Sequence, residues 1–365
     1  MKEKILLVIN TLDIGGAETL LNTHAEYFAN KQYEVYLVTL KNYKDNFLSE
    51  KILKNIEKKN YISLNFNSYF EFKKLKEFNK IVRLINPNKI ISHLEFSNII
   101  TSIICFFKYS KNHISFEHVQ QYDTYSFFRK LVKKITYQSN KINIAVSKQV
   151  ENDLREQLNI TNTVTLDNFI ADRFFNNYCS LTATTKFRNK FNLNCNDFIM
   201  ISIGRLEEQK NYLNLIDDIS SFLNLTQNAK LLIVGNGNQK NELIAKINYY
   251  KLDKQIIIIE PISNVEQLLD LSTIYLSYSI YEGFGLTIIE AMARRKKIIT
   301  TKTFGPNIYI KDSVNGFFID KTNLSDTLKR IYNDNILSKD IENNAFITAS
   351  EYKFEKHMNI LERYL

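Results

Sequence analysis

Two glutamates, Glu282 and Glu290, flank a glycine loop in the stretch YEGFGLTIIEAM at residues 281–292. The loop follows one apolar segment and leads into another of helical spacing, so a helix should begin near Leu286. The first N–H groups of a helix have no acceptor within it, and those of Leu286 and Thr287 would bind an anion such as a diphosphate. Glu290 could then accept hydrogen bonds from a ribose diol, and Glu282 from a sugar attached to the diphosphate. The alternative is a surface glutamate and a glutamate that favours the helix dipole.

Two cations follow another apolar segment, in ISIGRLEEQKN at residues 201–211. A strand should end at Gly204, and Arg205 and Lys210 then lie in the loop before the next helix. A guanidinium offers a planar fork to phosphate oxygens, whereas an ammonium offers a point charge. Both would favour a phosphate at this strand end. The alternative is two solvated surface cations, which is the usual situation of Arg and Lys.

A third loop, NTLDIGGAETLL, places Gly15 and Gly16 between a strand and a helix that begins near Ala17. Glycines allow the backbone to approach a ligand closely, and the helix start offers free N–H groups. The loop lacks the dinucleotide-binding pattern G-x-G-x-x-G. A tight turn, with Glu18 favourably placed in the first helical turn, is an equally good explanation.

The elements that must position these residues alternate along the chain. Short strand-like runs are separated by segments with apolar residues at helical spacing, a pattern typical of parallel sheets covered on both faces. We therefore predict an α/β fold with two Rossmann-like doubly wound domains that face each other across a cleft, where ligands bind beyond the carboxyl ends of the strands. The predicted strands are 4–10, 33–40, 61–66, 88–93, 113–118 and 141–147, and then 198–204, 229–237, 254–260, 272–279 and 296–301.

The two predicted domains divide at a polar stretch without strand periodicity, between about 168 and 196. We expect an N-terminal domain at 1–170 and a C-terminal domain at 171–345. The last helical segment, 346–365, would either extend the second domain or cross back to the first.

Composition narrows the class of protein. The 365 residues are 44% hydrophobic and 24% charged, with no apolar run long enough to span a membrane. Cys105, Cys179 and Cys195 lack metal-binding spacing and are expected to be free thiols in a reducing cytoplasm. No D-x-D triplet occurs, so we expect neither a metal site nor a cofactor.

Residues 1–170 contain 24 Lys and Arg against 17 Asp and Glu, which favours an anionic partner or simply a soluble surface.

The segments described above resemble, in order, the motifs of retaining glycosyltransferases with the GT-B fold, family 4 type. The E-x7-E pattern of YEGFGLTIIEAM is accompanied by GGAE near the start, GRLEEQKN, GNGN and SVNGFFID. The resemblance covers nearly the whole chain. It departs from the family at RRKK (294–297), at Ile308, where an acid is common, and at LDNFIAD, which lacks the usual Asn-Gly.

This resemblance implies that the domain at 1–170 binds the acceptor and that the domain at 171–345 binds the nucleotide-sugar donor. It also implies roles for individual residues. Arg205 and Lys210 would hold the diphosphate and stabilise it as a leaving group, in place of a metal ion. Glu290 would bind the ribose, and Glu282 the transferred sugar. Backbone amides of Gly285, Leu286 and Thr287 would meet phosphate, Gly15 and Gly16 would lie against the donor or the acceptor, and His118 would touch the donor sugar or an acceptor phosphate.

The expected reaction is the metal-independent transfer of a hexose, with retention, from a nucleotide diphosphate sugar, preferably UDP-linked. The acceptor would be a cell-surface polysaccharide, lipopolysaccharide or lipid-linked glycan. A sugar-nucleotide epimerase of the same fold is the first alternative. A basic nucleic-acid-binding protein is the second, but the sequence contains no recognisable reader module, and we expect no nucleic acid partner.

The segment 126–141 has the pattern of a basic amphipathic helix, with Phe127, Phe128, Leu131 and Ile135 against Arg129, Lys130, Lys133 and Lys134. We expect the apolar side to pack on the sheet and the cations to be solvated. The alternative is a helix that lies on an anionic membrane. The protein would then be cytoplasmic but peripheral at the inner face of the cell membrane.

Overall fold

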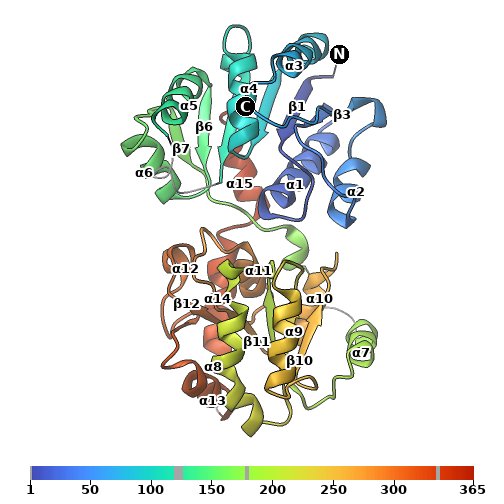
Figure 1. Ribbon diagram of the computed structural model, residues 1–365, viewed down its shortest axis with the longest axis vertical. Helices are drawn as coiled ribbons and strands as arrows, with labels where there is room; N and C mark the ends of the chain where they lie inside the picture. Colours follow the sequence, from blue (N-terminus) through green and yellow to red (C-terminus); the bar gives the residue numbers. More distant parts are fainter. Residues whose placement is uncertain (1, 119–125, 177–180, 334–337) are drawn as a thin grey trace. The chain divides into compact units, whose positions relative to one another are not determined.

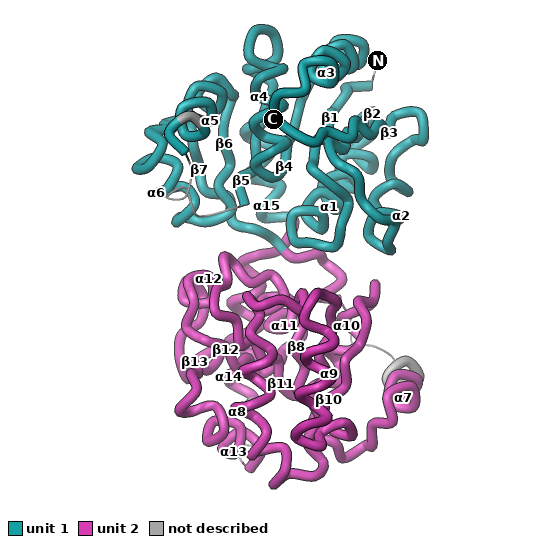
Figure 2. The backbone as a smooth tube through the Cα atoms, in the orientation of Figure 1, with its two compact units in different colours: residues 1–169, 355–365 teal, residues 170–354 magenta. Residues whose placement is uncertain are grey.

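The computed structural model describes residues 2–118, 126–176, 181–333 and 338–365, except for the side chains of 128, 181–184 and 338. Cys179 lies outside this part of the chain. The chain forms two compact units, residues 1–169 with 355–365 (unit 1) and residues 170–354 (unit 2) (Figure 2). Each unit is an α/β domain of its own.

Unit 1 is built on a parallel sheet whose seven described strands follow the order β3-β2-β1-β4-β5-β6-β7 (Figure 1). Consecutive strands lie side by side until the chain returns to the other side of β1, so the topological switch point lies between β1 and β4. The strands are β1 (Lys4–Ile9), β2 (Glu34–Thr39), β3 (Tyr61–Ser63), β4 (Lys89–His93), β5 (His113–Glu117), β6 (Ile142–Ala145) and β7 (Thr163–Thr165).

Helices cover this sheet because its strands are apolar on both faces. In β1, Leu6 and Val8 pack in a core with α3 and α4, whereas the alternate residues point to the opposite face. The helices are α1 (Gly16–Asn30), α2 (Phe47–Lys54), α3 (Phe72–Ile85), α4 (Glu95–Cys105), α5 (Phe127–Ser139), α6 (Lys148–Glu156) and α15 (Phe354–Leu361).

The last helix, α15, belongs to unit 1 for nearly all its length, although unit 2 precedes it in the sequence (Figure 2). His357 of α15 lies with its Nε2 atom 3.1 Å from Nε2 of His24 in α1. Just beyond α15, the Glu362 carboxylate accepts a hydrogen bond from the Tyr27 hydroxyl. The chain therefore returns to its first domain through specific polar contacts.

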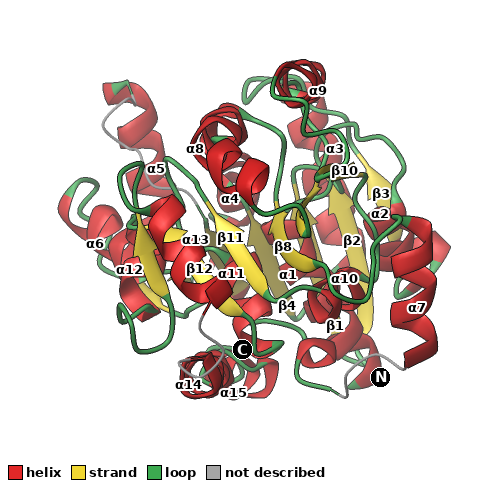
Figure 3. Cartoon of the chain, turned by 90° about the horizontal axis from the view of Figure 1, so that it is seen from below, coloured by secondary structure: helices red, strands yellow, loops and turns green. Residues whose placement is uncertain are grey.

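Unit 2 repeats the architecture with six described strands in the order β10-β9-β8-β11-β12-β13, so its switch point lies between β8 and β11. Helices flank the strands of both sheets (Figure 3). The strands are β8 (Phe198–Ile203), β9 (Ala229–Val234), β10 (Ile256–Ile259), β11 (Ile274–Ser277), β12 (Lys297–Thr301) and β13 (Phe317–Ile319). The helices are α7 (Leu181–Lys190), α8 (Tyr212–Leu225), α9 (Lys240–Tyr249), α10 (Val265–Leu271), α11 (Leu286–Ala293), α12 (Phe304–Tyr309), α13 (Leu324–Asn333) and α14 (Ser338–Ser350).

The predicted fold class of two Rossmann-like parallel-sheet domains is confirmed. All eleven predicted strands are present, each within the range expected for it. The two that the sequence did not reveal, β7 and β13, have only three residues each. β3 is equally short, but it lies in a longer strand-like run that extends to residue 66.

The expected packing of α5 is wrong. Its apolar residues Phe127, Leu131 and Ile135 are 82%, 41% and 51% exposed, whereas Lys133 is fully buried. Lys133 turns inward because its Nζ atom lies 2.8 Å from the buried Glu117 carboxylate at the end of β5. The helix is therefore held by buried charge and presents an apolar stripe outward.

Candidate active site at the carboxyl edge of the second sheet

The loops that follow β8 and β11 meet, because these two strands are neighbours at the switch point of unit 2. The backbone N–H of Ile280, after β11, donates to the carbonyl of Gln209, after β8, over 2.9 Å. The Gln209 amide also donates to the Tyr281 carbonyl over 2.9 Å. Gln209 thus fastens the loop that contains Lys210 to the loop that contains Glu282.

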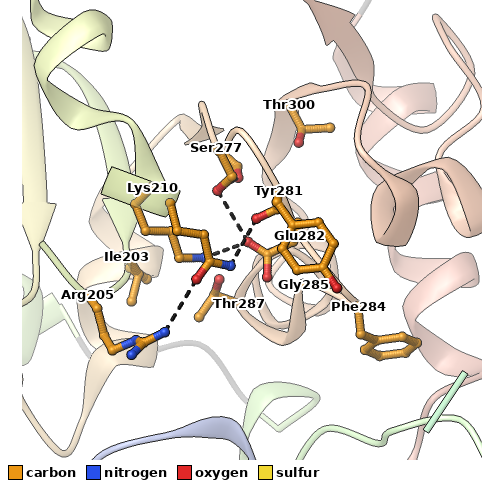
Figure 4. Close-up of polar contacts among 12 residues, drawn as sticks. Ile203, Arg205, Lys210, Ser277, Tyr281, Glu282, Phe284, Gly285, Thr287 and Thr300 are labelled. Atoms are coloured by element: carbon orange, nitrogen blue, oxygen red, sulfur yellow. Dashed lines mark hydrogen bonds and ion pairs between the residues drawn. The ribbon is translucent and has the colours of Figure 1, made fainter. Parts of the chain in front are cut away.

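Lys210 and Glu282 form an ion pair with Nζ 2.5 Å from Oε2 (Figure 4). Their side chains are only 15% and 12% exposed. The Ser279 hydroxyl donates to the same carboxylate oxygen over 3.3 Å. Gly204 permits this placement of the lysine, because a Cβ atom there would lie 2.7 Å from Lys210 Cε.

Arg205 lies in the same loop, and its side chain contacts other residues of that loop. Its guanidinium is 3.1 Å from the Glu207 carboxylate. It also donates to the side-chain oxygen of Gln209 over 3.3 Å, the contact drawn from Arg205 in Figure 4. The side chain is 61% exposed. Because an exposed ion pair contributes little free energy, Arg205 can exchange Glu207 for a phosphate at small cost.

Helix α11 begins at Leu286, after Gly285 with φ +82°, a left-handed conformation that favours glycine. The Tyr309 hydroxyl donates to the Phe284 carbonyl over 2.7 Å and thereby holds the turn. Within the described chain, the backbone N–H groups of Leu286 and Thr287 have no protein acceptor. They are the free donors that an anion at this helix start would use.

Glu290 is buried one turn into α11. Burial raises the pKa of its carboxyl group to about 7, the charge of Arg173 opposes this rise, and Glu266 adds to it. The described residues donate no hydrogen bond to this carboxyl group. A ligand with neighbouring hydroxyl groups would supply the missing donors.

These groups together offer two cations, a helix start with free donors and two carboxylates at a single sheet edge. This is a combination that suits a diphosphate between two polyols. Over the part of the chain that the structure describes, no group of three or more His, Cys, Asp or Glu is placed to hold a metal ion.

The remaining predicted residues lie in unit 1. His118 follows β5 and is partly exposed, and burial of most of the ring lowers its pKa to about 4. At the first loop, the Gly15 carbonyl accepts hydrogen bonds from the backbone and the hydroxyl of Thr19 over 3.0 and 2.9 Å. The Glu18 carboxylate lies directly against Gly15, so an anion near Gly15 and Gly16 would meet a like charge.

Two family models match the chain. Residues 14–171 match the family described as "Glycosyltransferase Family 4", and residues 183–347 match "Glycosyl transferases group 1". The chain belongs to the GT-B, family 4 type glycosyltransferases. The two matches together cover nearly the whole length of this family member.

Individual relatives of this glycosyltransferase family member are distant. The chain is 25% identical over 261 residues to a poly(ribitol-phosphate) alpha-N-acetylglucosaminyltransferase of Staphylococcus aureus, which covers 70% of this chain and 48% of the relative. It is 25% identical to the amylovoran biosynthesis glycosyltransferase AmsD of Erwinia amylovora, over 87% of this chain and 86% of the relative. The chain spans only 48%, 28% and 41% of the first three curated relatives it matches.

Solved structures show the same fold. A glycosyltransferase from Rickettsia africae superimposes with a TM-score of 0.84 at 21% identity, covering 100% of this chain and 98% of that one. Anabaena HepE, solved in complex with UDP, gives a TM-score of 0.81 at 17% identity, with 99% of each chain covered.

Sequence reasoning missed the supporting residues of this candidate site, chiefly Gln209, Ser279 and Tyr309. Gln209 stands directly before Lys210 in the GRLEEQKN segment, and Ser279 is the last residue of the predicted strand 272–279. Their positions near strand ends are the signal that could have found them. Tyr309 lies 25 residues from its acceptor, and no local pattern indicates that contact.

In the described chain, no helix is both long and apolar enough to cross a bilayer.

Proposed function

We propose that this protein transfers a sugar from a UDP-sugar to a glycan or lipid-linked acceptor, with retention at the anomeric carbon. The observation that carries the proposal is the Lys210–Glu282 pair beside the start of α11, at the switch point of unit 2. The UDP complex of HepE and the transferase names of the relatives support a nucleotide-sugar donor.

In this proposal the donor lies along the loop after β11. Lys210 and Arg205 hold the diphosphate from one side, and the amides of Gly285, Leu286 and Thr287 hold it from the other. Negative charge grows on the diphosphate as the bond from the sugar to the phosphate lengthens, and fixed cations and helix N–H groups stabilise that charge without reorganisation. Removal of one such donor typically slows turnover by about 10²–10³.

Glu290 accepts hydrogen bonds from the ribose hydroxyl groups, and Glu282 accepts them from the transferred sugar. The position of Glu282 beside Lys210 suits this role, because the sugar and the diphosphate to which it is attached lie next to each other. We assign retention from the family resemblance, with acceptor attack on the same face as the leaving group, because the described residues offer no evident nucleophile. His118, Gly15 and Gly16 of unit 1 serve the acceptor or the donor sugar.

We further propose that α5 places the protein on an anionic membrane, at the inner face of the cell membrane. The exposed residues Phe127, Leu131 and Ile135 repeat every fourth position and form one stripe along the helix. Lys130 and Lys134 border this stripe, and neither is in an ion pair within the described chain. An apolar stripe with flanking cations is the arrangement that binds lipid headgroups and acyl chains. A relative that acts on diphosphoundecaprenol supports a lipid-linked acceptor.

A panel of nucleotide-sugars tests the donor proposal, first by thermal shift and then by transfer to a lipid-linked acceptor. A UDP-sugar should raise the melting temperature most, and transfer should persist in EDTA if the cations replace a metal ion. Loss of transfer in EDTA would refute metal independence, and conversion of the donor without acceptor would instead favour the epimerase.

Sedimentation with anionic vesicles tests the membrane proposal. The wild-type protein should bind vesicles rich in anionic lipid, and the triple change of Phe127, Leu131 and Ile135 to Ser should abolish binding. Failure of the wild-type protein to sediment would end this proposal while leaving the donor site untouched.

A further inference from the structure

Charged side chains join α10 and α11 to residues 172–176 at two successive helical turns. α10 contains Glu266 and, four residues later, Asp270, whereas α11 contains Glu290 and is followed four residues later by Arg294. The backbone N–H of Arg294 donates to the Glu290 carbonyl over 3.2 Å, so the helical turn extends to Arg294. Residues four apart lie on the same face of a helix. Glu266 and Glu290 therefore form one charged layer, and Asp270 and Arg294 form the next.

The layer of Asp270 and Arg294 is a fixed fork. The Arg294 guanidinium is 2% exposed, and it donates through Nε to Oδ1 of Asp270 over 2.8 Å and through Nη2 to the other carboxylate oxygen. Its Nη1 atom donates to the carbonyls of Asn176 and Phe174 over 2.7 and 3.4 Å. A bidentate pair of this kind has a defined geometry. The fork therefore ties the segment that contains Phe174 and Asn176 to α10 and α11.

The other layer contains the residue next to those carbonyls. Arg173 directly precedes Phe174, and its Nε atom lies 3.6 Å from Oε2 of Glu266. Neither of these two buried atoms has a hydrogen-bond partner within the described chain. Because the contact is too long for a hydrogen bond, the positive charge of Arg173 is not committed to Glu266 alone. It acts on Glu290 as well.

Glu290 needs such a charge when a ligand covers it. A carboxylate can accept two hydrogen bonds from a diol, whereas a protonated carboxyl group accepts less well. A bound ribose would exclude water, and a buried carboxyl group then favours its neutral form unless a cation lies near. Of the two charged groups that act on Glu290, Arg173 lowers its pKa and Glu266 raises it. Arg173 therefore opposes protonation at the place where the ribose would bind.

We infer that Arg173 keeps Glu290 a carboxylate in the nucleotide complex and so acts on the ribose through it. The Arg294–Asp270 fork is the positioning element that holds Arg173 there. This inference rests on the proposed role of Glu290 toward the ribose. It also gives a function to Arg294, the first residue of the RRKK segment, which the sequence marked only as a departure from the family pattern.

The titration of Glu290 in the nucleotide-free protein tests the inference directly. With 13C-labelled glutamate, nuclear magnetic resonance follows the side-chain carboxyl signal against pH, and loss of the signal in Glu290→Gln assigns it. Arg173→Met should raise the midpoint of the titration by about 1 pH unit, because it removes the opposing cation. Glu266→Gln should lower the midpoint, because it removes a like charge. A shift in the same direction in both variants, or no shift, would overturn the inference.

A charge-keeping variant separates charge from packing. Arg173 is only partly buried, with 37% of its side chain exposed, so its variants should fold. Arg173→Lys keeps the positive charge and should leave the midpoint of Glu290 close to that of the wild type. A midpoint raised as far as in Arg173→Met would show that lost packing is the cause, and the inference would be wrong.

Arg294→Lys tests the fork. The lysine keeps the charge but cannot bind Asp270 and the two carbonyls together. With the segment released, the midpoint of Glu290 should rise toward that of Arg173→Met. An unchanged midpoint would show that the fork does not hold Arg173 in place.

Lys296→Met is the matched control for Arg294→Lys. Lys296 is a buried cation just beyond the same helix, and its Nζ atom donates to the Ser272 carbonyl over 3.0 Å. Within the described chain it has no hydrogen bond to residues 172–176. Both variants should lower the melting temperature, but only Arg294→Lys should move the midpoint. An equal shift in both would show that a loosened core, and not the fork, is responsible.

Calorimetry with UDP separates this inference from the proposed function. A midpoint raised by about 1 pH unit should weaken UDP binding by Arg173→Met about fivefold at pH 7, with little loss at pH 9, where Glu290 is ionised in both proteins. If the midpoints shift as expected but no protein binds UDP, the effect of Arg173 on Glu290 stands and the nucleotide proposal is wrong. If Arg173→Met binds UDP normally at pH 7 while Glu290→Gln is impaired, the ribose role stands and this inference is wrong.

Discussion

Lys210 and Glu282 are 72 residues apart in the sequence, yet their charged groups meet with 2.5 Å between Nζ and Oε2. The pair joins the loops after the two strands at the switch point of unit 2. A diphosphate that binds Lys210 must therefore share the ammonium group with a carboxylate. The diphosphate and Glu282 would therefore compete for Lys210, and mutation of Glu282 can test this competition.

Glu282→Gln should bind UDP about tenfold more tightly than the wild type and should turn over more slowly. Removal of the carboxylate leaves Lys210 free for phosphate and removes a like charge, an effect of about 1.4 kcal/mol. Calorimetry with UDP measures it. Ser279→Ala removes a hydrogen bond to the same oxygen but keeps the charge, so its affinity should match the wild type; weaker UDP binding by Glu282→Gln would contradict the competition.

Affinity for UDP should rise with pH through about 7, because the pKa of Glu290 is raised to about 7 by burial. Above this pH the carboxylate can accept two hydrogen bonds from the ribose, and below it the protonated group accepts less well. The affinity for UDP would be measured between pH 5.5 and 8.5 for the wild type and for Glu290→Gln. In the variant, of Glu290 and the UDP phosphate only the phosphate still titrates. Equal pH dependence in the two proteins would exclude Glu290 from ribose binding.

Gly285→Ala should destabilise unit 2 by roughly 1–3 kcal/mol. Gly285 has φ +82°, and a Cβ atom would lie 2.8 Å from the Tyr309 hydroxyl. Gly283, in the same loop, offers the matched control, since the nearest atom to its Cβ position is 3.5 Å away. Thermal unfolding of Gly283→Ala should stay close to the wild type, and equal losses in the two variants would show that the left-handed turn is not the cause.

Lys133→Met should lower the free energy of unfolding of unit 1 by about 3–5 kcal/mol, because it leaves the buried Glu117 carboxylate without its cation. The double variant with Glu117→Gln should recover much of this loss, since no unpaired charge remains. Denaturant unfolding measures both. Lys130→Met, on the same helix but not ion-paired within the described chain, should have little effect; a similar loss there would mean that helix propensity explains the result.

The sequence predicted the features that depend on local pattern. The eleven predicted strands lie in mostly apolar runs, and such runs are typical of buried parallel strands. The meeting of Lys210 with Glu282 also followed from the sequence in part, because both stand after strands and the strand ends of a doubly wound sheet share one edge.

The features it could not predict depend on contacts between distant segments. The local pattern predicts that the charged side chain of Lys133 is exposed to solvent. Lys133 is buried instead, because it pairs with the buried Glu117 at the end of β5. His24 and His357 are 333 residues apart, so neither gives a signal of the other. Such contacts form only when distant segments meet in the folded protein, so no short stretch of sequence indicates them.

A structure of the protein crystallised with UDP tests the central claim most directly. The account predicts the diphosphate within hydrogen-bond distance of Lys210 Nζ and of the backbone N–H groups of Leu286 and Thr287, with the ribose hydroxyl groups on Glu290. A diphosphate bound elsewhere, with the Lys210–Glu282 pair unchanged and the start of α11 empty, would contradict it.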